Sequence, residues 1–92
     1  MIYNAKAVGT ANTETRTYIG RPSRWGNPFE IGLDGKRPVV IRKYREWIVD
    51  QPDLMAALPE LAGKHLVCWC APEACHGEIL LELVAKLDRN YL

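Results

Sequence analysis

Residues 65–87 read HLVCWCAPEACHGEILLELVAKL, and this stretch indicates the fold class. The apolar run from His65 predicts a buried strand that continues to Trp69, after which Pro72 turns the chain. Between Gly77 and Leu87 the apolar residues recur at helical spacing and predict an amphipathic helix. A strand that leads into a helix N-terminus is typical of open α/β sheets, which bind ligands at that edge.

The segments that precede this stretch add strands and helices in an α/β order. Loose alternation predicts a strand over residues 2–8, and a short strand over residues 17–19 ends at Gly20. A helix is expected from Pro38 to Gln51, where Pro52 ends it, because apolar residues follow helical spacing: Val40, Ile41, Tyr44, Trp47 and Ile48. Asp53 is the expected N-cap of a short helical turn that reaches Leu58.

This order predicts one small α/β domain over residues 1–92, with a three- or four-stranded Rossmann-like sheet flanked by helices. The sequence carries no Gly-rich dinucleotide fingerprint. Twelve basic and eleven acidic residues give a net charge of +1, so we do not expect nucleic acid as a partner. Three cysteines, no signal-peptide pattern and no apolar stretch near ~20 residues predict a cytoplasmic protein without a membrane partner.

All three cysteines and one of the two histidines fall within nine residues, and this density indicates chemistry or binding. Cys68, Cys70, Cys75 and His76 are residue types that hold zinc, although the usual zinc knuckle spaces its cysteines by two residues. Alternatively, Cys75 or Cys70 is a nucleophile, with His76 as the acid/base, because a helix N-terminus lowers the pKa of a thiol. Cys68 alone also fits a structural role, since free cysteine is among the most buried residue types. We expect no cofactor, with zinc as the alternative.

The segment Arg21-Pro22-Ser23-Arg24-Trp25-Gly26-Asn27-Pro28-Phe29 is a second candidate for binding. Its prolines and glycine exclude a continuous helix or strand. Arginine offers a planar fork for phosphate or carboxylate, and an aromatic face can stack on a base. We therefore expect ligand-binding roles for these residues: Arg21, Ser23, Arg24, Trp25 and Asn27. In the alternative, Trp25 and Phe29 fill the core while the arginines face water.

Two sequence motifs together resemble a known family. The first runs from Tyr18 to Phe29, YIGRPSRWGNPF, and the second is CWCAPEACH over residues 68–76. With these motifs the chain resembles DUF4326, a domain-of-unknown-function family frequent in bacteriophages and their hosts. The resemblance covers roughly residues 17–85 and implies a shared fold but no established activity.

We expect a ligand-binding protein for a nucleotide-like or phosphorylated compound, with a phage role in host nucleotide signalling or metabolism as the expected setting. The loop with Arg21 would face the last helix, and unpaired N–H groups from Gly77 onward would help to hold an anion, with Cys70 nearby. Two alternatives stay open. One is a Cys/His-dependent enzyme that acts on a nucleotide or nucleoside, and the other is a zinc-stabilised module that binds a host protein.

Overall fold

The computed structural model of the chain describes residues 2–71 and 73–90. Within them, three short strands form a parallel sheet: β1 (Ile2–Asn4), β2 (Arg16–Tyr18) and β3 (His65–Cys68). The strand order is β1-β3-β2, so the last strand of the sequence lies in the centre of the sheet. In the register, Leu66 of β3 pairs with Ile2 on one side and with Thr17 on the other. The predicted α/β class is confirmed, with three strands in the described residues.

The expected first strand, residues 2–8, is wrong beyond Asn4, because helix α1 (Ala5–Val8) begins there. The side chain of Asn4 accepts a hydrogen bond from the backbone N–H of Lys6 at 2.8 Å and so caps the helix. A buried Ala5 followed by an exposed Lys6 gives the same alternation as a strand. Strand β2 begins and ends one residue earlier than expected, and β3 stops one residue before Trp69.

Two α-helices and a 3₁₀ helix connect β2 to β3: α2 (Arg37–Ile48), α3 (Pro52–Ala57) and η1 (Leu58–Leu61). Of the apolar residues predicted to face the core from α2, Val40, Tyr44 and Ile48 are buried. Ile41 and Trp47 are partly buried and pack against the core from its edge. Asp53 is not the N-cap of α3. Gln51 holds that position, because Pro52 occupies the first turn, where its missing N–H costs nothing.

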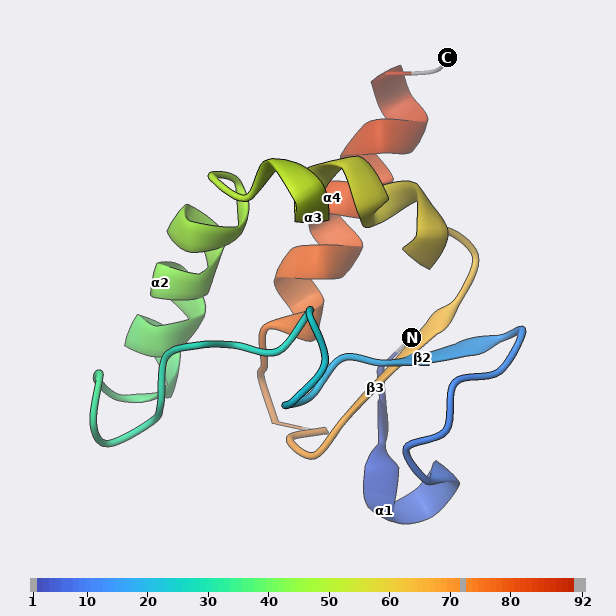
Figure 1. The fold of residues 1–92 in the computed structure, drawn as a ribbon. Helices are drawn as coiled ribbons and strands as arrows, with labels where there is room; N and C mark the ends of the chain where they lie inside the picture. The colour runs from blue at the N-terminus through green and yellow to red at the C-terminus, as the bar shows by residue number, and fades with distance from the viewer. Residues whose placement is uncertain (1, 72, 91–92) are drawn as a thin grey trace.

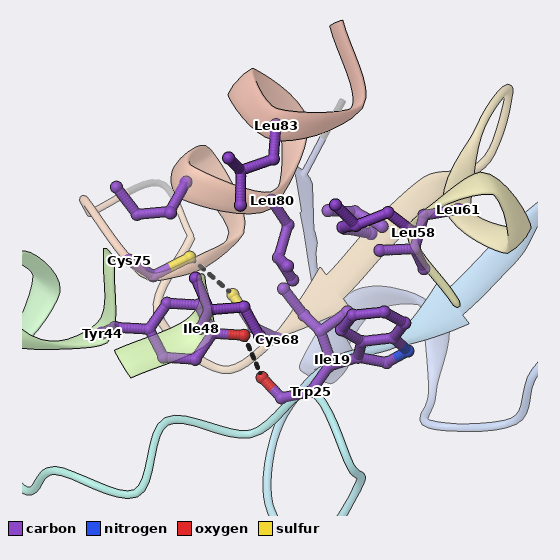
Figure 2. Packing of buried hydrophobic residues seen from close by; sticks show 12 residues of the cluster. Ile19, Trp25, Tyr44, Ile48, Leu58, Leu61, Cys68, Cys75, Leu80 and Leu83 are labelled. Atoms are coloured by element: carbon purple, nitrogen blue, oxygen red, sulfur yellow. Dashed lines mark hydrogen bonds between the residues drawn. The ribbon is translucent and has the colours of Figure 1, made fainter. Parts of the chain in front are cut away.

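Helix α4 (Gly77–Asn90) starts where the sequence predicts and packs against β3, η1 and α2. Figure 1 shows α4 between α2 and the strands. The core lies around its first turns, where side chains from separate elements meet (Figure 2). Among the described residues, no helix combines the length and the apolar character needed to cross a membrane.

Candidate functional site

A pocket of about 320 Å³ lies at the carboxyl ends of β2 and β3, and we call it the carboxyl-edge pocket. It brings together the two motifs singled out in the sequence, with the start of α2 as a third wall. Its lining residues are Tyr18, Gly20, Arg21, Asn27, Phe29, Ile31, Arg37, Val40, Ile41, Cys68, Trp69, Cys70, Ala74, Cys75 and His76. The two loops that bear these motifs lie on the same side of the molecule (Figure 1). The volume is at the small end of the range for ligand pockets and suits one small molecule.

Arg37, the first residue of α2, connects that helix to the loop between Cys68 of β3 and Gly77 of α4, which we call the cysteine loop. Its guanidinium donates to the Ala74 carbonyl at 2.9 Å and pairs with the Glu73 carboxylate at 2.9 Å. The pKa of Arg37 is raised, mainly by a hydrogen bond with the Cys70 side chain. Arg37 therefore places its positively charged guanidinium group at the pocket, beside Cys70.

Arg21 lies at the opposite wall and is more exposed. Its guanidinium pairs with Glu30 at 3.1 Å, and 54% of its side chain is accessible to solvent. The backbone carbonyl of Arg21 accepts a hydrogen bond from the Tyr18 hydroxyl at 2.9 Å, which fixes the start of the loop. Arg21 thus lines the pocket, with its charge paired to Glu30, and its expected role in ligand binding stays a prediction.

Two thiols form the floor of the carboxyl-edge pocket. Cys68 ends β3, Cys75 precedes α4, and their Sγ atoms lie 3.3 Å apart (Figure 2). A hydrogen bond from Cys75, together with backbone N–H groups of Cys70 and Ala71, lowers the pKa of the Cys68 thiol to about 6. The pKa of Cys75 is raised because it donates that bond and is buried. When the pair loses a proton, these opposite pKa shifts favour the charge on Cys68 over Cys75. The sequence analysis expected the reactive thiol at Cys75 or Cys70, whereas the lowered pKa of Cys68 makes this residue a further candidate.

His76 is buried between the loop and α2. Its Nε2 lies 2.7 Å from the Ile19 carbonyl oxygen, and because a carbonyl only accepts, Nε2 carries the proton. The ring makes an edge contact with Tyr44, with centroids 4.9 Å apart. Burial lowers the pKa of His76, so the neutral imidazole is favoured. His76 is tied to the scaffold through Nε2, which leaves Nδ1 as the nitrogen able to accept a proton.

The zinc alternative requires several ligands that converge on one point. Within residues 2–71 and 73–90, no three His, Cys, Asp or Glu side chains are grouped so that they could hold a metal ion. The one close sulfur pair is that of Cys68 and Cys75, and His76 directs Nε2 to a carbonyl instead.

The expected unpaired N–H groups at the start of α4 are already used. Gly77 N–H donates to the Cys75 sulfur at 3.3 Å, and Glu78 N–H donates to the Cys75 carbonyl at 3.2 Å. The N–H groups of Ile79 and Leu80 both donate to the His76 carbonyl. The prediction that backbone N–H groups at the start of α4 are unpaired and available to an anion is therefore wrong.

Gly77 lies outside the carboxyl-edge pocket, and its lack of a side chain serves packing. A Cβ atom at this position would approach Ile19 Cδ1 to 2.9 Å and Ile2 Cδ1 to 3.0 Å. The first turn of α4 consequently lies close against the ends of the buried Ile19 side chain and the partly buried Ile2 side chain. A contact of this kind is structural and offers no group to a ligand.

Trp25 and Asn27 have structural roles in the fold. Trp25 is only 3% exposed, and its carbonyl accepts a hydrogen bond from the buried Tyr44 hydroxyl at 2.8 Å (Figure 2). Asn27 donates to the Val40 carbonyl at 3.2 Å and accepts from the Phe29 N–H at 2.9 Å. The structure thus agrees with the alternative in which Trp25 fills the core, and Asn27 joins the loop to α2.

Ser23 and Arg24 line a second, separate hollow of about 290 Å³ with Trp25 and Glu60. The Ser23 hydroxyl is buried there without a hydrogen-bond partner among the described residues. Arg24 pairs with Glu60 at 2.6 Å and lies over the Trp25 ring. The binding residues predicted from one loop are therefore divided between two surfaces.

Two residues that the sequence analysis missed support the cysteine loop. The side chain of Asn4 donates to the carbonyls of Trp69 and Ala71, at 3.2 and 2.7 Å. Trp69 lines the pocket, and 57% of the residue is exposed to solvent. Its Nε1 donates a hydrogen bond to the Tyr18 hydroxyl at 2.8 Å. No sequence signal marked Asn4, because it lies inside the strand expected over residues 2–8.

Comparison with known proteins finds relatives of this chain in viruses. It is 35% identical over 90 residues to the uncharacterized protein R718 of Acanthamoeba polyphaga mimivirus, covering 78% of this chain and 68% of that protein. It is 28% identical over 90 residues to an uncharacterized 12.4 kDa protein of the nrdA-td intergenic region of Enterobacteria phage T4, covering 92% and 82%. No solved structure matches significantly. The family model described as domain of unknown function DUF4326 matches residues 2–86, and the chain belongs to that family.

Proposed function

We propose that this protein binds a small anionic compound, nucleotide-like or otherwise phosphorylated, in the carboxyl-edge pocket. The observation that carries the proposal is the charge of the lining: Arg21 and Arg37 contribute to it, and none of the lining residues is an aspartate or a glutamate. Two guanidinium groups offer planar forks that match phosphate or carboxylate oxygens. The location also suits the proposal, because Rossmann-like folds bind ligands outside the carboxyl ends of their parallel strands.

Each arginine has a carboxylate partner that a ligand could replace. Arg21 pairs with Glu30 and Arg37 with Glu73, and the side chains of both glutamates are more than half exposed. Ion pairs of this exposed kind stabilise a protein by only ~0–1 kcal/mol. An anionic ligand that displaces these ion pairs therefore loses little binding free energy. Side chains, rather than the N–H groups of α4, supply the positive charge in this proposal.

The proposed biological setting follows from the relatives. They come from a giant virus and a bacteriophage, so a small nucleotide-like compound of the host is a reasonable target. Capture of a host nucleotide signal, or a step of host nucleotide metabolism in the cytoplasm, would use such a pocket. Both roles need the same first event, which is anion binding at Arg21 and Arg37.

Titration of Arg37→Ala and Arg21→Ala with inorganic phosphate, pyrophosphate and adenosine 5′-monophosphate tests the proposal. Hydrogen bonds to charged groups contribute ~1.5–3 kcal/mol, so each variant should bind about 10- to 150-fold more weakly. Lysine at either position should restore only part of the affinity, because an ammonium lacks the fork. Arg45→Ala is the matched control, since Arg45 pairs with Glu82 and does not line the pocket. Equal binding by wild type and both pocket variants would exclude this site.

A second candidate, cysteine-dependent chemistry on the bound compound, is favoured by the thiol pair. Cys68 faces the pocket, and Cys75 and two backbone N–H groups stabilise its thiolate. A thiolate so placed can form a bond to an electrophilic carbon or phosphorus of the compound as the leaving group departs with the electron pair of the broken bond. Neutral His76 can then accept the proton of the water that hydrolyses the covalent product and restores the thiolate. Mass analysis after incubation with small alkylating agents tests this candidate. Modification of Cys68 before Cys70, despite the greater burial of Cys68, would support it, and modification of Cys70 alone would oppose it.

A further inference from the structure

Trp69 is a large aromatic residue that the fold exposes and yet holds in place. Its side chain lines the carboxyl-edge pocket, and the residue is 57% exposed. Exposed apolar area of this size is unfavourable in water, at roughly 25 cal/mol per Å². An indole that stays at the mouth of a pocket under this cost calls for a partner.

A hydrogen-bond relay fixes the orientation of that indole. Nε1 of Trp69 donates to the Tyr18 hydroxyl at 2.8 Å, and this hydroxyl donates to the Arg21 carbonyl at 2.9 Å. Asn4 holds the backbone of the same residue through the Trp69 carbonyl at 3.2 Å. The indole is thus tied to both the cysteine loop and the Arg21 loop.

Gly20 makes room for the relay. A Cβ atom at Gly20 would lie 2.4 Å from the Tyr18 hydroxyl oxygen and 2.6 Å from its ring carbon Cζ. Any side chain at residue 20 would therefore push the tyrosine away from Trp69. The glycine and the tyrosine of the first motif consequently serve to place the tryptophan of the second.

The surroundings of Trp69 favour a flat ring with a negative charge beside it. The pocket is also lined by the rings of Tyr18 and Phe29 and by the two arginines. Aromatic side chains pack best against flat partners, and indole faces are common platforms for nucleobases. A ligand that had only a phosphate would leave these rings in contact with water.

We propose that Trp69 is the stacking platform for the planar heteroaromatic part of the anionic ligand, held in position by Tyr18. This inference rests on the proposed function, because the anion is bound by Arg21 and Arg37. It adds the ligand class: a ring such as a nucleobase linked to a phosphate.

Three probes separate the ring from the anion: adenosine 5′-monophosphate, ribose 5-phosphate and adenosine. Wild type should bind the nucleotide about 10-fold or more tightly than ribose 5-phosphate, the range expected for one stacked base. Trp69→Ala should lower nucleotide affinity to that of ribose 5-phosphate and leave the latter unchanged. Trp69→Phe should restore part of the difference, and Tyr18→Phe, which removes only the hydroxyl, should give an intermediate loss.

Val49→Ala is the matched control, because Val49 is 48% exposed but does not line the pocket. Tryptophan fluorescence gives a second readout: the nucleotide should quench wild type and the Val49 variant, but not Trp69→Phe. If the nucleotide and ribose 5-phosphate bind wild type equally, or if Trp69→Ala keeps their ratio, the stacking role is wrong while the anion site stands. If no phosphate-bearing probe binds wild type, both the proposed function and this inference are overturned.

Discussion

The three tryptophans place one residue type in three environments. Trp25 is buried under the Arg21 loop, Trp47 is half-buried beside Tyr44, and Trp69 is mostly exposed at the pocket. The buried position depends on a contact from α2, where the Tyr44 hydroxyl donates to the Trp25 carbonyl. No local sequence pattern indicates that contact, which explains why Trp25 was expected to stack on a ligand and Trp69 was not.

The first prediction concerns that contact. Tyr44→Phe removes a buried donor and leaves the Trp25 carbonyl without its partner. A buried polar group without a partner costs ~1–3 kcal/mol, so the free energy of unfolding should fall by about that amount. Urea denaturation measures it, with Tyr3→Phe, at a half-buried ring beside His65, as the control. Unchanged stability would show that water replaces the tyrosine.

The second prediction concerns Cys68 and pH. Absorbance of the thiolate near 240 nm should rise with a midpoint at about pH 6, and Cys68→Ser should abolish this step. Folding stabilises the thiolate, so the contribution of Cys68 to stability is present above the ordinary pKa of 9.0 and is lost as the pH falls through about 6. Cys75 acts in the opposite direction, because its raised pKa favours folding below pH 9.0 and opposes it above.

Two observations would contradict this assignment. A thiolate step at the ordinary pKa of cysteine in wild type would mean that the sulfur pair does not share a proton as described. A step near pH 6 that survives in Cys68→Ser and disappears in Cys70→Ser would move the thiolate to Cys70.

At the scale of elements, the cysteine loop is held by three neighbours that come from distant parts of the chain. Asn4 binds it from the end of β1, Arg37 from the start of α2, and the Tyr18 hydroxyl from the end of β2 through Trp69. These residues follow strand ends or begin a helix, so the sheet edge positions them. The loop thus takes its shape from its surroundings.

The third prediction separates the two roles of Asn4. Asn4→Asp keeps the oxygen that caps α1 but removes the N–H donors to the carbonyls of Trp69 and Ala71, whereas Asn4→Ala removes both. Loss of an N-cap costs ~0.5–2 kcal/mol, so the alanine variant should melt lower than the aspartate variant. Amide exchange in residues 69–71 should become faster in both variants. If exchange there is unchanged, Asn4 does not hold the loop.

Strong periodicity and turn residues allowed most elements to be predicted from the sequence. Helices α2 and α4 have long apolar stripes, and β3 is a short apolar run, so the starts of all three were predicted to within one residue, while both helix ends differ by three residues. The segment after Asn4 was wrong because four residues of helix satisfy the same alternation as a strand. Local pattern determines an element only when it repeats over several turns.

The candidate site was predicted in part for a related physical reason. The two motifs do meet at one pocket, because both follow strands whose carboxyl ends share an edge. Arg37 was missed because nothing in its sequence neighbourhood marks it, and it reaches the pocket only through the packing of α2. The free amides expected at α4 were lost to Cys75 and His76, whose carbonyl and sulfur atoms lie one turn before them.

At the scale of the whole molecule, the fourth prediction concerns metal. The described residues provide no group of three metal-binding side chains, and Cys68 and Cys75 lie within the buried core. Treatment with EDTA should therefore leave the melting temperature unchanged, because structural zinc would contribute folding free energy directly. Elemental analysis of protein purified without chelator is the complementary measurement. One equivalent of zinc that Cys70→Ser or Cys75→Ser releases would restore the metal alternative.

The position of β3 in the centre of the sheet has a consequence for the order of synthesis. The edge strands β1 and β2 are made first, yet each pairs only with β3, whose residues His65–Cys68 follow much later in the chain. On the ribosome, the first two strands must wait for their common partner with their hydrogen-bonding edges open. Contacts between residues so distant in sequence form slowly, and open edges favour aggregation in the interval. Nascent chains that stop before residue 65 should therefore depend on chaperones more than the released protein does.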